Sequence, residues 1–164
     1  MDKISTCLWF DGNAEDAARF YTSLFPNSQI ERIDSAPADT PSGPEGTILT
    51  VSFTLGGRSF IGLNGGPEFP FTEAISLSID CADQAEVDRY WDALLADGGQ
   101  PSVCGWLKDR FGLSWQVIPR QLPEMLQSQD RAAAKRVMEA MLQMVKIDVA
   151  QLERAYAGEA LPVG

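Results

Sequence analysis

The sequence predicts an α+β fold in which a βαβββ module occurs twice and a helical tail follows. Hydrophobic periodicity indicates the order strand, helix, three strands in the first part of the chain and again in the second. Shifting the first predicted helix by about 70 residues places Arg19-Phe20-Tyr21 on Arg89-Tyr90-Trp91, which indicates a duplication. Because 164 residues make one domain of ordinary size, we expect a single domain, residues 1–164. Its predicted parts are the two modules and the tail, residues 1–66, 71–119 and 122–158.

The first module begins with an apolar strand and an amphipathic helix. Asn13 is a typical N-cap residue for this helix, and Pro26 follows its end. The proline- and glycine-rich loop of residues 35–46 is long for a strand connection, so we expect it to be either a lid or disordered. The expected elements are a strand at 4–10, a helix at 13–25 and strands at 28–34, 47–55 and 58–64.

The second module and the tail have clearer helix boundaries. Asp83 and Glu86 form a capping-box pattern, and Asp130 and Asp148 precede the two main helical patterns of the tail, the second of which ends at Gly158. The methionines of the first tail helix are predicted to pack in the core or in a dimer interface. The expected elements are a strand at 74–80, a helix at 83–97, short strands within 101–107 and 113–119, and tail helices at 131–145 and 149–157.

Charge and composition exclude several partner classes. The chain has 13 basic and 23 acidic residues, a net charge of −10 and a pI near 4.4, which disfavours nucleic acid and anionic membrane surfaces as partners. No apolar run approaches the roughly 20 residues of a membrane-spanning helix, and the N-terminus lacks the apolar core of a signal peptide. We therefore expect a cytoplasmic protein.

The chain contains no histidine, which rules out Ser-His-Asp and Cys-His nucleophile systems and HExxH zinc sites. Its three cysteines, Cys7, Cys81 and Cys104, are scattered without metal-binding spacing, so we expect reduced thiols in the core. Any catalysis would then depend on carboxylates, Lys, Tyr, Cys or a bound group.

Three segments, "FTLGGRSFIGLNGGPEFPFTEAISLSIDC", "CGWLKDRFGLSWQVIP" and "RVMEAMLQMVKIDVAQLERAYAG", resemble the PhnB-like branch of the glyoxalase/bleomycin-resistance, or vicinal-oxygen-chelate, superfamily. Members of this branch often carry the label 3-demethylubiquinone-9 3-methyltransferase. The resemblance implies two βαβββ modules that form a cupped eight-stranded half-barrel, a bacterial homodimer, and a small-molecule pocket in the cup.

The resemblance also implies where a metal would bind, because superfamily enzymes hold a divalent ion with one side chain from each of four strands. The corresponding positions are Thr6, Gly62, Ala74 and Gln116. Only Gln116 is a useful ligand, and a shift by one residue would add only Glu73, so we expect no metal and no cofactor.

With Thr6, Gly62 and Gln116 placed on the cup, strand alternation predicts which neighbours share that face. The predicted cup residues also include Leu8, Phe10, Phe60, Asn64, Ser76, Ser78 and Ser114, while Trp9, Ile61, Leu63, Ile75, Leu77, Ile79, Trp115 and Val117 should face the helices. The candidate ligand-binding residues are Thr6, Phe10, Asn64, Ser76, Trp106 and Gln116. We expect Lys108, Asp109 and Arg110 to form a solvated turn.

Three functions are compatible with this pattern. The first is a protein that binds a small organic molecule in a metal-free cup. The second is a metal-independent lyase, isomerase or oxidoreductase of the same superfamily, acting on a small carbonyl or quinone-like substrate, with Glu73, Asp80 or Cys104 as weak catalytic candidates. The third is the methyltransferase of the family label. The sequence argues against it, because "FDGNAED", at the end of the first strand, is not a glycine-rich nucleotide-binding turn.

Overall fold

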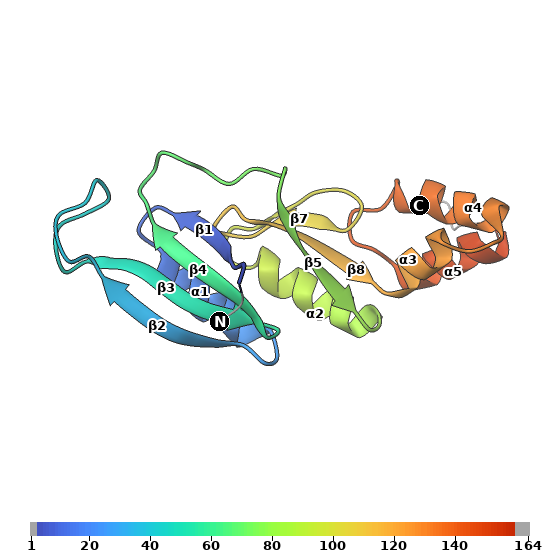
Figure 1. Ribbon diagram of the computed structural model, residues 1–164. Helices are drawn as coiled ribbons and strands as arrows, with labels where there is room; N and C mark the ends of the chain where they lie inside the picture. Colours follow the sequence, from blue (N-terminus) through green and yellow to red (C-terminus); the bar gives the residue numbers. More distant parts are fainter. Residues whose placement is uncertain (1–2, 160–164) are drawn as a thin grey trace. The chain divides into compact units, whose positions relative to one another are not determined.

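The computed structural model describes residues 3–159 and divides the chain into two compact units, residues 1–71 and 72–164 (Figure 1). Each unit contains one four-stranded mixed sheet and one βαβββ module. The α+β class, the duplication and the helical tail predicted from the sequence are thereby confirmed. The eight strands are divided equally between the two sheets.

The sheet of the first unit has the order β1-β4-β3-β2. Strand β1 runs parallel to β4, and the other pairs are antiparallel. The elements are β1 (Thr6–Phe10), α1 (Ala14–Leu24), β2 (Gln29–Ser35), β3 (Ile48–Leu55) and β4 (Arg58–Asn64). Their bounds lie within a few residues of those expected from the sequence.

Helix α1 covers one face of this sheet (Figure 1). A β-carbon added at Gly62 would lie 3.2 Å from the β-carbon of Ala14, so the helix approaches the sheet closely where both residues are small. The buried residues of this layer include Leu8, Phe10, Val51, Phe53 and Phe60 from the strands and Ala14, Ala17, Ala18 and Tyr21 from the helix.

The start of α1 differs from expectation. Asn13 occupies the N-cap position but its side chain makes no capping hydrogen bond. Instead, the Asn64 side chain accepts a hydrogen bond from the Ala14 amide at 2.9 Å and donates one to the Ile48 carbonyl at 3.0 Å. An amide from the end of β4 therefore satisfies a free N–H of the first helical turn.

The loop of residues 35–46 has a hydrogen-bonded turn at its centre. Thr40 and Gly43 exchange backbone hydrogen bonds of 2.8 and 3.1 Å, and the Asp39 carboxylate accepts from the Glu45 amide. Ala36 closes the base by pairing with Thr47 and Gly46. These hydrogen bonds give the connection between β2 and β3 a defined turn geometry.

The second unit has the sheet order β5-β8-β7-β6, with β5 parallel to β8. Its elements are β5 (Ser76–Cys81), α2 (Gln84–Leu95), β6 (Gln100–Pro101), β7 (Trp106–Lys108), β8 (Ser114–Pro119), α3 (Gln121–Leu126), α4 (Arg131–Met141) and α5 (Val149–Ala157). Asp83, Asp130 and Asp148 cap α2, α4 and α5 as predicted, and Gly158 ends α5 in the left-handed conformation.

The tail forms a small core of its own around Leu122, Val137, Ile147 and Leu152. Helix α4 ends at Met141 rather than at residue 145. Met144, in the turn that follows, is buried, whereas Met138 is 41% exposed, so only part of the methionine cluster packs in the core. None of the helices within residues 3–159 is long and apolar enough to cross a bilayer.

The turn between α4 and α5 attaches the tail to the second module. The side chain of Gln84 donates to the Ile147 carbonyl at 3.1 Å and accepts from the Val149 amide at 2.8 Å. The amides of Cys104 and Gly105 donate to the carbonyls of Met144 and Val145, each at 2.8 Å. The start of β7 is thus held by the tail.

Candidate functional site

Polar side chains share the face of the second sheet that lies opposite α2. Residues in register on neighbouring strands project to the same side of a sheet. One register row joins Ser78, Gln116 and Trp106, and the next joins Ser76, Ser114 and Lys108. We call these six residues the polar face. The alternate residues, which include Leu107, Ile79, Cys81, Trp115 and Val117, are buried on the side of α2.

Gln116 is held within this face by Ser76. Its Nε2 atom donates a hydrogen bond of 2.8 Å to Ser76 Oγ, and the pair links β8 to β5. Both residues were predicted to lie on the cup side with Ser78 and Ser114, and the register agrees with that assignment. The hydrogen bond fixes the amide plane, which leaves Gln116 as an oriented polar group rather than a flexible one.

The hydroxyl of Ser114 is the unusual group of the polar face. Ser114 is 1% exposed, and its Oγ atom has no hydrogen-bond partner among the described residues. Buried polar atoms are normally satisfied, so an orphan of this kind calls for an explanation. Strand alternation places Ser114 on this face, two residues from Gln116, but nothing in the sequence distinguishes it from the other serines of the face as a ligand-binding residue.

An ion pair lies at the end of the polar face where Ser114 is found. Lys108 Nζ lies 2.6 Å from Glu73 Oε1, and the two side chains are 35% and 63% exposed. The hydrogen bond from Lys108 is the main cause that holds the pKa of Glu73 below its ordinary value. Lys108 was predicted to belong to a solvated turn, but it lies in β7, in register with Ser114.

The prediction of a solvated turn is also wrong for Asp109, which is buried. Its Oδ1 atom accepts hydrogen bonds from the amides of Phe111 and Leu113, and its Oδ2 atom accepts one from the Trp115 indole at 2.8 Å. Arg110 pairs with Asp97 at 2.8 Å. Asp109 therefore organises the hairpin that aligns β7 with β8.

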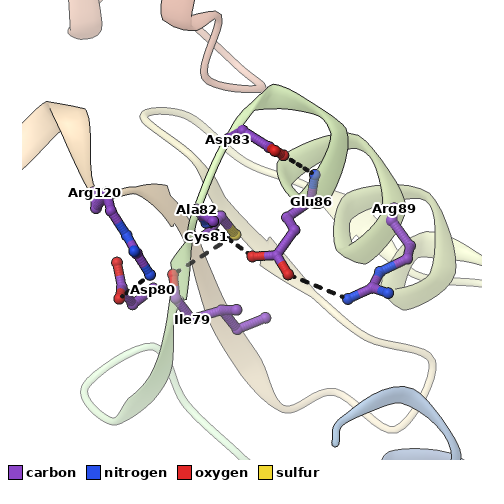
Figure 2. Close-up of polar contacts among 8 residues, drawn as sticks. All are labelled: Ile79, Asp80, Cys81, Ala82, Asp83, Glu86, Arg89 and Arg120. Atoms are coloured by element: carbon purple, nitrogen blue, oxygen red, sulfur yellow. Dashed lines mark hydrogen bonds and ion pairs between the residues drawn. The ribbon is translucent and has the colours of Figure 1, made fainter.

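Asp80, another weak catalytic candidate, is paired with a basic side chain and does not form an acid–base pair with the neighbouring Cys81. Figure 2 shows Asp80 turned toward Arg120 on one side of Cys81, and Glu86 toward Ala82 and Arg89 on the other. Burial, together with the nearby acidic charges, raises the pKa of the Cys81 thiol to about 12. This thiol is a core group and is not activated as a nucleophile.

The other two cysteines, Cys7 and Cys104, are not fully buried, which differs from the prediction of core thiols. All three cysteines are free, but Cys7 is exposed and Cys104 is half-buried. Cys104 has a φ of 59°, which is unusual for a residue with a side chain, and directly precedes the tail-bound Gly105. Partial burial raises the pKa of Cys7 as well.

In the first unit, the predicted cup face is wrong. Phe10 and Asn64 are 3% and 6% exposed on the side of the sheet that α1 covers, and Thr6 is in register with Phe60 on that same side. The correction extends to Leu8, Phe60 and Gly62, which pack toward α1, whereas Trp9, Ile61 and Leu63 alternate with them and face the other side. Asn64 serves as a helix cap.

Trp9 is half-buried on the side of the first sheet opposite α1. Its indole nitrogen donates to the Gly66 carbonyl at 2.8 Å, and its ring meets Phe69 edge-on at 4.9 Å. The first sheet therefore presents an aromatic surface on this side. Of the six candidate ligand-binding residues, Ser76, Trp106 and Gln116 therefore share the polar face of the second sheet.

The four positions implied for a superfamily metal do not fit a divalent ion. Gly62 lies under α1, Ala74 has no donor atom in its side chain, and the amide of Gln116 is bonded to Ser76. Within residues 3–159, no group of three or more His, Cys, Asp or Glu side chains is placed to hold a metal. The residues present do not supply the donor set that a divalent cation needs.

The chain is similar in sequence to one protein family and in structure to several solved proteins. Residues 2–118 match the model of the 3-demethylubiquinone-9 3-methyltransferase family. A Bacillus cereus structure, described as a putative 3-demethylubiquinone-9 3-methyltransferase and PhnB protein, is 38% identical, covers 70% of this chain and 97% of its own, and has a TM-score of 0.62.

A Pseudomonas aeruginosa protein of known structure shares the fold at 22% identity, with a TM-score of 0.56 over 70% of this chain and 95% of its own. No curated protein matches the chain. The family match ends within β8, before the helical tail. The chain belongs to the 3-demethylubiquinone-9 3-methyltransferase family, in the PhnB-like branch of the glyoxalase/bleomycin-resistance superfamily.

Proposed function

We propose that the chain binds a small organic molecule on the polar face of the second unit. The observation that carries this proposal is the buried Ser114 hydroxyl, which has no hydrogen-bond partner within residues 3–159. Burying an unsatisfied polar group costs about 1–3 kcal/mol, a cost that a ligand able to accept a hydrogen bond would remove. Such a ligand would also meet the oriented amide of Gln116 and the ring of Trp106.

The composition of the face supports recognition by hydrogen bonds and stacking. Small-molecule sites combine a few placed polar groups with aromatic or apolar surface. Here hydroxyl, amide, indole and ammonium groups come from three adjacent strands. A homodimer, expected from the family resemblance, remains part of the proposal, and the molecular mass in solution tests it.

Neither Glu73 nor Cys104 is set up for acid–base or nucleophilic catalysis. A carboxylic acid that donates a proton near neutral pH needs a raised pKa, but the pKa of Glu73 is lowered by Lys108. The backbone amide of Cys104 donates to the Met144 carbonyl of the tail, and among the described residues no basic side chain is paired with its thiol. An enzyme acting on a carbonyl or quinone-like substrate is the alternative, in which Gln116 would polarise a carbonyl oxygen.

The methyl transfer in the family name receives the least support from these residues. Strands β1 and β5 lead into α1 and α2 through the short connections Asp11-Gly12-Asn13 and Ala82-Asp83. Neither connection has the glycine-rich sequence that lets a backbone approach a nucleotide phosphate.

An NMR titration of nitrogen-15-labelled protein tests the proposed function. A panel of neutral, cationic and anionic one-ring compounds should shift the side-chain signals of Gln116 and Trp106 and the backbone signal of Ser114. Gln116→Ala should weaken this response, while Gln100→Ala on the edge strand β6 serves as the control. Shifts scattered over both units, or equal effects of the two variants, would contradict the proposal.

A further inference from the structure

The ion pair between Glu73 and Lys108 lies beside the orphan hydroxyl of Ser114. Lys108 is in register with Ser114 on one side, and Ser76, three residues after Glu73, is in register with it on the other. The pair therefore joins β7 to the segment just before β5, at the end of the sheet where β8 begins.

We propose that Lys108 and Ser114 form a subsite for an anionic group of the ligand, and that Glu73 occupies this subsite as a displaceable carboxylate. This inference rests on the proposed function and specifies its ligand class. A ligand carboxylate would replace Glu73 on the Lys108 ammonium and accept the hydrogen bond that Ser114 can donate. Displacement exposes little new charge, because Glu73 is already 63% exposed.

The register also sets the shape of the ligand. Gln116 and Trp106 form the next row of the same face, two residues along each strand from Ser114 and Lys108. Two residues of a strand span about 7 Å. A planar ring bearing a carboxylate at one end matches this spacing, with the ring beside Trp106 and the carboxylate at Lys108. The structure thus points to aryl carboxylates.

Two probes with the same ring separate charge from shape. Sodium benzoate carries the carboxylate, and benzyl alcohol replaces it with a neutral hydroxymethyl group. In NMR titrations of the full chain, benzoate should shift the Ser114, Gln116 and Trp106 signals at lower concentration than benzyl alcohol. Added salt should weaken benzoate binding more than benzyl alcohol binding, because only benzoate meets a charge.

Variants of the ion pair test the displacement directly. Glu73→Gln should bind benzoate about two- to fivefold more tightly, which is the range expected when a competing exposed ion pair is lost. Lys108→Gln and Ser114→Ala should each weaken benzoate by roughly tenfold, because a charge-assisted hydrogen bond is removed. Asp97→Asn is the matched control, since Asp97 is an exposed carboxylate paired with Arg110 of the same hairpin.

Three results would overturn the subsite. The first is an equal affinity of benzoate and benzyl alcohol, and the second is an unchanged benzoate affinity in Glu73→Gln. The third is the absence of benzoate shifts in both the wild-type protein and Glu73→Gln. In each case the proposed function still stands if a neutral or cationic compound of the panel shifts the Gln116 and Trp106 signals, and it fails with the subsite if none does.

Discussion

Gln116 and Ser76 lie 40 residues apart in the chain and are joined by a hydrogen bond of 2.8 Å across parallel strands. The bond aligns the amide of β8 with the hydroxyl of β5 on the face opposite α2. Beside it, the hydroxyl of Ser114 is buried and has no hydrogen-bond partner in the part of the chain that the structure describes. The hydroxyl of Ser76 thus supports the structure, while the hydroxyl of Ser114 is available to donate a hydrogen bond to a bound molecule.

Replacing Ser114 with Ala should stabilise the free protein. The change removes a buried hydroxyl without a partner, so we expect the free energy of unfolding to rise by about 1 kcal/mol. Ser76→Ala is the matched control and should lower it by about 0.5–1.5 kcal/mol, since the Gln116 amide then loses its acceptor. Urea unfolding measures both values. A destabilised Ser114→Ala protein would show that the hydroxyl is satisfied in the free state.

Asn64→Ala should destabilise the first unit without affecting the polar face. The variant loses hydrogen bonds to the Ala14 amide and the Ile48 carbonyl, and we expect a loss of about 1–2 kcal/mol. Asn13→Ala should cost less, because the Asn13 side chain makes no capping hydrogen bond. Equal losses in urea unfolding would contradict the assignment of Asn64 as the cap.

Gly105→Ala should weaken the attachment of the tail. A β-carbon at this position would lie 2.9 Å from Ile147 Cγ1 and 3.0 Å from the Val117 carbonyl oxygen, at a φ of +81°. Gly112 has a similar φ of +87° but open space around it, so Gly112→Ala reports the backbone strain alone. We expect Gly105→Ala to cost about 1–3 kcal/mol more than its control. Hydrogen exchange of the α4 and α5 amides should locate the loss in the tail.

The ion pair of Lys146 and Asp88, with Nζ and Oδ1 2.7 Å apart, should give the tail a defined pH range of stability. The hydrogen bond from Lys146 lowers the pKa of Asp88 from 3.8, so the carboxylate stabilises the fold above that value, and the effect is lost as pH falls through its lowered pKa. The hydrogen bond to Asp88 raises the pKa of Lys146 from 10.5, so the ammonium stabilises the fold below that value, and the effect is lost as pH rises through its raised pKa.

Lys146→Met measures this contribution. Its melting temperature should lie below that of the wild-type protein between about pH 4 and pH 10, and the difference should shrink at either extreme. The difference should be small, because both side chains are solvent-exposed, at 39% and 45%. Lys135→Met is the control, since Lys135 and Glu139 form a looser exposed pair at 3.7 Å. A difference that stays constant down to pH 3 would contradict the role of Asp88.

The sequence was informative about the second sheet because its polar and apolar residues alternate. Ser76, Ser78 and Gln116 alternate with Ile79 and Val117, so the face could be predicted from period alone. In the first sheet, β1 carries Cys7 and Trp9 on one side and Leu8 and Phe10 on the other. With both sides apolar, the period does not decide which faces the helix, and the position implied for Thr6 by the family resemblance led to the wrong side.

The ion pair of Glu73 with Lys108 and the orphan hydroxyl of Ser114 could not be predicted from the sequence. Both depend on the register of three strands, and a shift by one residue would turn each side chain to the other face. The close approach of Gly62 to Ala14 is consistent with the sequence, because a small residue in a strand and another at the start of a helix permit close packing.

Native mass spectrometry of the freshly purified protein reports subunit number, bound metal and retained small molecules together. We expect an organic adduct without metal, released or reduced in amount in Ser114→Ala and Gln116→Ala. A stoichiometric divalent ion, or an adduct equally retained by both variants, would contradict binding at the polar face.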